Sequence, residues 1–506
     1  RKISIESGSI TVDGTAVLLK KANTSFSVDP GELTIGGTVV LLKATRASPI
    51  ETGALSVEGS SVALKVTRKL SVESGELTIG GTTLGLEHSR FLSIESGSLS
   101  VDGTAADLKA GKVVASASGA LSIEGSTLGL KATRTLPIES GALTIDGTVI
   151  SLEVGRAAAV ASGVLSIEGS ALEFKLTRKI SIESGALIVD GSVVAIVQDP
   201  ITFPIESGAL SVAGTAVDLS RTKEVFIRPG SIQVIGSTVK LKYKRIFHIE
   251  SGAMTIGGSA VEFKRTTYNF PIESGSMTIR GTGVGFNNNG NYVITLEPGS
   301  LSIIGDTIDV SLGGNRHLTI ESGSMTVAGT ATELSRIRKL KATKGSLSVQ
   351  GTPVSLVRAG DRSIVIEPGS LRITGSTVNL NSTIPNVLEP GSLHIDGSDI
   401  GLRKGRTLAL DNGSLSITGA NLILRYGKFI DAESGHLSIA GSGIIFDRTI
   451  LYSTISFTFG SVYSKLFFGS DRPVFEFEIR KTPEFVFGGD RPIFEMERKS
   501  SFTVKD

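Results

Sequence analysis

One short repeat limits the fold of this chain more than any other feature of its sequence. Glycines recur in pairs six residues apart, from Gly8 and Gly14 to Gly435 and Gly441, and there are 20 such pairs. Most successive pairs lie 22 residues apart, and a few lie 23 or 24 apart. A fixed period of this length is typical of repeat architectures, in which each unit packs against its neighbours. The sequence therefore predicts a stack of similar units.

Each unit contains three apolar pairs with the spacing i, i+2, and polar or small residues stand between them. In the first unit the pairs are Ile3 and Ile5, Ile10 and Val12, and Val17 and Leu19. This alternation is typical of strands with one buried face, and it does not fit the spacing of a helix. An all-β fold with three short strands in each unit is expected.

Two turns in each unit end in glycine. Proline precedes the first glycine in several units, as at Pro30 and Pro229, and Ile235 or Ile304 precedes the second. Neither residue type accepts a positive φ, which excludes a type I′ hairpin and favours a type II turn with glycine in its third position. Such turns are interpreted as corners. Three faces and three corners predict an elongated triangular β-helix of 20 units of ~22 residues.

The number of chains that share the core is open at this stage. In a single-chain β-solenoid the first-corner glutamates would stack about 4.8 Å apart, and a ladder of like charges is unfavourable. Three intertwined chains could instead place this Glu corner beside the Arg corner. The intertwined homotrimer is therefore preferred, with the single-chain solenoid and an antiparallel meander as alternatives. The Arg corner comprises Arg46, Arg68, Arg90, Arg134, Arg156 and Arg178.

The repeat stops after Phe446, which divides the chain into a β-repeat shaft, residues 1–446, and a C-terminal segment, residues 447–506. This segment holds 10 of the 21 Phe residues. A nine-residue motif beginning at Phe468 recurs 19 residues later, beginning at Phe487. The segment is expected to be a β-structured cap, or alternatively a docking element, because aromatic residues and Arg concentrate binding energy. The candidate docking residues are Phe468, Arg472, Phe475, Phe487, Arg491 and Phe494.

Composition argues against several kinds of function. Lys and Arg total 51 against 49 Asp and Glu, so no general affinity for nucleic acid or an anionic membrane is expected. The chain has no Cys, and no metal-binding or catalytic motif occurs in it. We therefore expect no catalytic, cofactor-binding or metal-binding residues and no enzyme activity. The five His residues are isolated, and surface positions are expected for them, including His88 in the variable third corner.

The units resemble the short Gly-Ser repeats of bacteriophage virion and tail-fibre proteins, as in GSLSVDG at residues 97–103 and GSLSITG at residues 413–419. The resemblance implies a virion fibre, commonly trimeric, with a structural or adhesive duty. The implied partners are further copies of the chain, other virion or filament proteins and a host-surface receptor. The alternative is a cell-surface adhesin or an extracellular filament subunit. Because the sequence begins at Arg1 inside a repeat, a fragment or processed product is expected.

Overall fold

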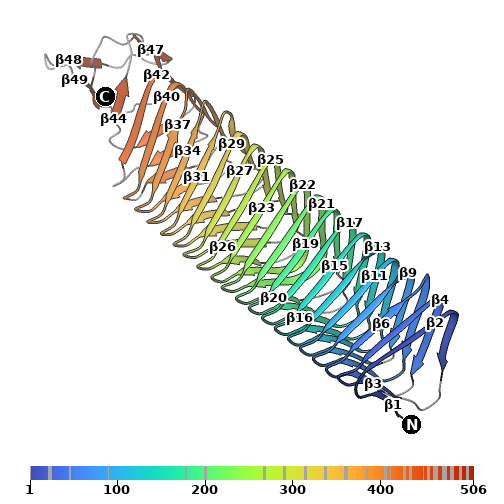
Figure 1. Cartoon of the computed structure of the whole chain (residues 1–506). Coiled ribbons are helices and arrows are strands. Elements are labelled where there is room, and N and C mark those ends of the chain that lie inside the picture. The colour runs from blue at the N-terminus through green and yellow to red at the C-terminus, as the bar shows by residue number, and fades with distance from the viewer. Residues whose placement is uncertain are drawn as a thin grey trace. The chain divides into compact units, whose positions relative to one another are not determined.

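A computed structural model gives the fold (Figure 1). It describes residues 2–20, 25–44, 47–88, 90–176, 179–198, 202–265, 269–288, 292–312, 316–335, 339–357, 363–381, 386–403, 407–410, 412–425, 429–431, 436–447, 450–452, 456–459, 465–469, 476–478, 484–488, 493–496 and 501–505. These residues form strands, bends and short connections, and no helix occurs among them. The chain divides into two compact units, residues 1–244 with 252–258 and residues 245–251 with 259–506.

In the first unit a short strand alternates with a long one. The short strands are β1 (Lys2–Ile5), β3 (Ser25–Val28), β5 (Ala47–Ile50), β8 (Lys69–Val72), β10 (Phe91–Ile94), β12 (Val113–Ser116), β14 (Thr135–Ile138), β16 (Ala157–Val160), β18 (Lys179–Ile182) and β20 (Thr202–Ile205). The long strands are β2 (Ser9–Lys20), β4 (Glu32–Ala44), β9 (Glu76–His88), β11 (Ser98–Ala110), β13 (Ala120–Ala132), β15 (Ala142–Val154), β17 (Val164–Leu176), β19 (Ala186–Gln198) and β21 (Ala209–Ile227). One long strand is replaced by β6 (Ala54–Glu58) and β7 (Ser61–Val66).

The second unit follows the same scheme, and β22 (Ser231–Ile249) and β23 (Ala253–Arg265) contain residues of both units. Its short strands are β24 (Asn269–Ile272), β26 (Tyr292–Leu296), β28 (Arg316–Ile320), β30 (Lys339–Ala342), β33 (Ser363–Ile366), β36 (Asn386–Leu388), β39 (Thr407–Leu410), β41 (Phe429–Asp431) and β43 (Ile450–Tyr452). Its long strands are β25 (Ser276–Asn288), β27 (Ser300–Leu312), β29 (Ser324–Ser335), β40 (Ser414–Arg425) and β42 (His436–Asp447). Three long strands are divided, into β31 (Ser346–Gly351) and β32 (Val354–Val357), β34 (Ser370–Gly375) and β35 (Thr377–Asn381), and β37 (Ser392–Asp396) and β38 (Asp399–Arg403).

Each turn of the repeat pairs in parallel with the next turn of the same chain. In the first unit Leu92 of β10 aligns with Leu70 of β8 and Val114 of β12, a shift of one repeat in either direction. The long strands pair in the same way, with Leu99 of β11 beside Leu77 of β9. Within each unit the strands of successive turns therefore lie side by side as a β-solenoid, as Figure 1 shows. The predicted all-β repeat fold is confirmed.

The long strand carries two sides of each turn, because it passes through the second corner without interruption. In β13 the buried residues are Leu121 and Ile123 before the corner and Leu128 and Leu130 after it. The alternation of buried and exposed residues changes phase at Gly125, and this phase change keeps both apolar pairs facing inward. The three inward pairs predicted from the sequence are thus present on two strands rather than on three.

The interior also contains a seventh inward column, at the end of the long strand. In successive turns this position holds buried Ala44, Val66, His88, Ala110 and Ala132. The column was not predicted, because its residues vary in size and polarity and do not extend the i, i+2 pattern of large apolar residues.

The parallel pairing of successive turns distinguishes between the chain arrangements that the sequence left open. Because the repeats pair with repeats of the same chain, the structure takes the form of the single-chain β-solenoid. The parallel pairing of the repeats is incompatible with the antiparallel meander. Association of three copies concerns more than one chain and stays a prediction.

The type II turns predicted at the corners are wrong for most of the units. A type II turn needs a φ of about +80° at its glycine. Among the described corner glycines Gly8 has such a φ, 85°, whereas Gly81 and Gly125 have φ 156° and 155°, which is nearer to extended backbone. Gly97 and Gly119, at the same corner as Gly8, lack a φ of this kind. The glycines are required for a different reason, which is the close approach of neighbouring turns described below.

The C-terminal segment continues the parallel stack for a short distance and ends in antiparallel pairs. Besides β43, its strands are β44 (Ser456–Phe459), β45 (Lys465–Gly469), β46 (Glu476–Glu478), β47 (Glu484–Gly488), β48 (Ile493–Met496) and β49 (Ser501–Lys505). β44 and β45 pair in parallel with β42, and β47 pairs in parallel with β45. β49 then pairs antiparallel with β46 and β48. The segment was predicted to be a cap or a docking element, and that prediction stays open.

Removing one whole repeat should leave the fold intact. Deleting residues 98–119 joins Gly97 to Ala120, and the following turn can then pair in the register that the deleted turn had. We expect an unchanged β-type circular dichroism spectrum and a Tm close to that of the full chain. The control deletes residues 98–108, which puts the inward pairs out of phase with their neighbours. Equal tolerance of both deletions would contradict the repeat register described here.

Candidate functional site

The predicted docking residues lie in the C-terminal segment, and the structure describes only some of them. Phe468 and Phe487 are aligned with each other in β45 and β47, so the sequence motif repeated after 19 residues corresponds to paired strands. Phe494 lies in β48. Arg472, Phe475 and Arg491 lie outside the described residues, so the proposal that these six residues form one docking surface stays a prediction.

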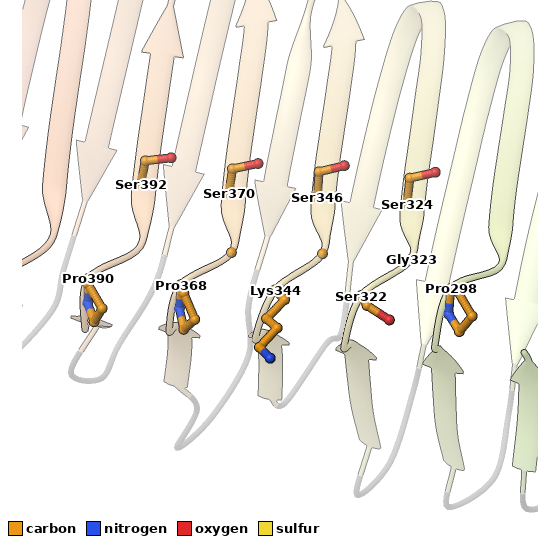
Figure 2. Close-up of a pocket in the computed structure, with 12 residues that line it drawn as sticks. Pro298, Ser322, Gly323, Ser324, Lys344, Ser346, Pro368, Ser370, Pro390 and Ser392 are labelled. Atoms are coloured by element: carbon orange, nitrogen blue, oxygen red, sulfur yellow. The ribbon is translucent and has the colours of Figure 1, made fainter.

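Shallow grooves follow the first corner in each unit. In the first unit such a groove has a volume of about 950 Å³ and follows this corner from Gly8 to Ala120. In the second unit a groove of about 320 Å³ follows the same corner from Pro298 to Ser392. Figure 2 shows Ser324, Ser346 and Ser370 of this groove in one column on neighbouring strands. The grooves are therefore lined by serine hydroxyls and backbone, and they offer hydrogen bonds along several turns.

Glycine forms the floor of these grooves because successive turns approach too closely for a side chain. A Cβ atom added at Gly97 would lie 2.2 Å from the carbonyl oxygen of Gly75 and 2.7 Å from Cγ1 of Val72. The same arrangement is repeated at Gly119, whose added Cβ would lie 2.3 Å from the oxygen of Gly97. Contacts this short require the backbone to move. The corner glycine thus keeps adjacent turns within hydrogen-bonding distance.

Where serine precedes the corner glycine, it links its turn to the one before. Oγ of Ser96 donates a hydrogen bond of 2.8 Å to the carbonyl oxygen of Glu73, and Ser118 donates in the same way to Glu95. The backbone N–H of Ser96 donates to the same Glu73 oxygen at 2.7 Å. These side chains therefore have a structural role at the corner, and a catalytic role is not needed to explain their repetition.

The first-corner glutamates do stack, as expected for a single-chain solenoid. The N–H of Glu73 donates to the oxygen of Ile50, and the N–H of Glu95 donates to the oxygen of Val72, one turn apart. The ladder is interrupted by Ala117, and Nζ of Lys69 lies 3.9 Å from Oε1 of Glu95. Interruption and nearby cations reduce the repulsion that the sequence argument weighed against this arrangement.

On the third side of each turn, which is the part of the long strand after the second corner, glutamates interrupt a column of lysines. Lys109 lies beside Lys131, whereas Glu87 and Glu153 each lie beside a lysine. Lys65 bonds Glu87 of the next turn, and Nζ of Lys131 lies 2.7 Å from Oε2 of Glu153. The hydrogen bond and positive charge of Lys65, together with the charge of Lys109, hold the pKa of Glu87 below its usual value. The hydrogen bond to Asp107 raises the pKa of Lys109. All of these groups are exposed, so they contribute little to stability.

His88 lies inside the solenoid, and its predicted place at the surface was wrong. Its side chain is 3% exposed, it stacks between Val66 and Ala110, and neither ring nitrogen has a hydrogen-bond partner. Burial lowers its pKa from 6.5 to about 4, because the charged form loses its hydration. The sequence signal was present but weak: His88 occupies the position of Val66 and Ala110 in neighbouring repeats.

Among the described residues no group of three or more His, Cys, Asp or Glu is placed to hold a metal ion. No helix long and apolar enough to cross a membrane was found in that part of the chain. No protein-family model, curated protein or solved structure matches this chain.

Replacing the groove-floor glycine should destabilise the fold. We expect Gly97→Ala to cost about 1–3 kcal/mol, because its methyl group would overlap the turn before it. Gly85→Ala is the matched control: its added Cβ meets nothing within 4 Å, so the change should be neutral or stabilise by about 0.4–1 kcal/mol. Thermal and chemical unfolding of both variants measures the difference. Equal stability of the two variants would refute the close-packing explanation.

The buried histidine should make stability depend on pH. The unfolded chain binds a proton at His88 near pH 6.5 and the folded chain near pH 4, so stability is full above 6.5 and falls as the pH is lowered through this window. The complete loss is about 3 kcal/mol. His88→Val should remove this part of the Tm decrease between pH 7.5 and pH 4. The partly exposed His394 provides the control, His394→Ser, which should keep the wild-type pH dependence. A wild-type pH dependence in His88→Val would show that the buried ring is not its source.

Proposed function

We propose that this chain is a structural protein whose repeats form the shaft of a phage virion fibre, such as a tail fibre, that holds an attachment tip away from its anchor. The observation that carries this proposal is the turn-to-turn register. Each repeat makes with the next the same parallel pairing that it makes with the one before. Such a fold can be extended by adding repeats, each lengthening it by about 4.8 Å.

The chemistry of the repeat supports a structural role. The residues that recur in most units have structural roles within the stack. The apolar pairs fill the interior, the glycines allow close stacking, and the serines donate hydrogen bonds to the preceding turn. The resemblance of the repeats to those of phage virion proteins adds the proposed location, which is the tail or another appendage of a virion. Association with further copies, most simply as a homotrimer, and with other virion proteins belongs to the same proposal.

A cell-surface adhesin or an extracellular filament subunit is the alternative. The first-corner grooves favour it, because they present hydroxyl groups along several turns of each unit. A repeated polar surface of this kind is suited to contact with an extended ligand or a neighbouring filament. An adhesin of this type would use the same stacked repeats as its stalk.

Locating the native protein distinguishes the two proposals. Antibodies raised against the purified chain would be applied to purified virus particles and to washed cell envelopes from the same culture. Labelling of an appendage on the particles is expected for the shaft. Labelling confined to the envelopes would refute the virion proposal and support the adhesin, and cytosolic label alone would refute both.

A further inference from the structure

Five cations stand in one column at the third corner of the first unit. Arg68, Arg90, Lys112, Arg134 and Arg156 are spaced by one repeat. The backbone stacks them directly: the carbonyl oxygens of Arg68, Arg90 and Lys112 accept hydrogen bonds of 3.0–3.1 Å from N–H groups of the following turn. The N–H of Arg156 donates to the oxygen of Arg134 at 2.8 Å. We call these five residues the cation column.

The cation column is accessible, and its charges are not neutralised within the described part of the chain. The four Arg residues are exposed and Lys112 is half-buried. None of the five takes part in the ion pairs found among the described residues. The acidic side chains just before the column in the chain, Glu87 and Glu153, already bind Lys65 and Lys131.

Like charges stacked at the strand spacing of about 4.8 Å repel one another at every level. On the third side of the same turns Glu87 and Glu153 interrupt the lysines and reduce this cost. No acidic residue interrupts the cation column, since all five levels are cationic. An anionic partner that runs along the corner would neutralise each level and convert the repulsion into attraction.

The arrangement of the charges indicates the form of such a partner. A single file of cations at a corner matches one linear chain with regularly spaced anionic groups. A nucleic-acid duplex, with phosphates on two strands, would contact a broader basic face. Single-stranded nucleic acid is usually bound by aromatic residues that stack on successive bases. Here the residues that follow the five cations are Lys69, Phe91, Val113, Thr135 and Ala157, of which one is aromatic.

We propose that the cation column binds a linear anionic polysaccharide through its carboxylate or sulfate groups. Arg guanidinium groups bind such oxyanions through two parallel hydrogen bonds. Phe91, which is 42% exposed beside Arg90, adds an apolar surface on which a sugar ring can pack. This binding goes beyond the structural role proposed above and would serve a virion shaft and a surface adhesin equally.

The test compares two variants of the full chain with the same net charge. The column variant carries Arg68→Gln, Arg90→Gln, Arg134→Gln and Arg156→Gln. The control variant carries Lys240→Gln, Lys242→Gln, Arg280→Gln and Arg372→Gln, which removes four exposed cations from other places. Circular dichroism and Tm confirm that both are folded. Binding to immobilised heparin, a linear sulfated and carboxylated polysaccharide, is measured at low and high salt, with neutral dextran as the uncharged probe.

The wild type should bind heparin, release it as salt screens the charges, and not bind dextran. The column variant should bind at least about tenfold more weakly, as expected from the loss of four exposed ion pairs. The control variant should stay within about twofold of the wild type. An equal loss in both variants, or none in the column variant, would overturn the proposal.

Two further outcomes would assign the column to a different partner. Tighter binding of single-stranded DNA than of heparin would make nucleic acid the ligand. Sedimentation of the wild type as a salt-sensitive oligomer without polysaccharide, and of the column variant as a monomer, would make a second copy of this chain the partner. Either result would refute the polysaccharide proposal.

Discussion

The close approach of successive backbone turns is the constraint on which the rest of this structure depends. Parallel hydrogen bonding holds neighbouring turns about 4.8 Å apart, and at the corners this leaves no room for a Cβ atom. The glycines at these positions therefore have a packing function, and most do not need the positive φ that glycine often supplies. Once the corners are held in register, the paired side chains stand beside their equivalents in the next repeat, even where a repeat is one or two residues longer.

Because equivalent residues of successive repeats stack, a residue type that recurs at one position forms a column, and its effect is repeated in every turn. A column of Leu, Ile or Val gives a continuous apolar interior, and a column of Ser at the first corner gives a series of hydroxyl-to-carbonyl bonds between turns. A column of like charges instead gives repulsion at every level. On the third side Glu87 and Glu153 interrupt the lysines, and at the first corner residues such as Ala117 interrupt the glutamates, so the repulsion in both columns is reduced. The uninterrupted cation column at the third corner is the exception, which makes it the surface on which an anionic partner would have the largest effect.

Among the buried polar residues, His88 shows what a titratable group does in an inward column. His88 fills the place that alanine or valine fills in other turns, and it does so without a hydrogen-bond partner. Because a buried ring without partners disfavours its charged form, this one position links the stability of its turns to pH. The repeated contacts on either side can tolerate such a substitution, since each turn packs against two others.

The sequence alone determined the repeat, the all-β class, the three inward apolar pairs and the separate composition of the C-terminal segment, because a strict period shows which residues share an environment. It did not determine which neighbour supplies that environment: the tertiary structure decided that the next turn of the same chain does so. The same limit explains the errors at the corner glycines and at His88. Local turn rules consider only adjacent residues, whereas the atoms that exclude a side chain at Gly97 belong to Gly75 and Val72 of the preceding turn. The cation column was visible in the sequence as an Arg corner, but only the stacking of the turns brought its charges together.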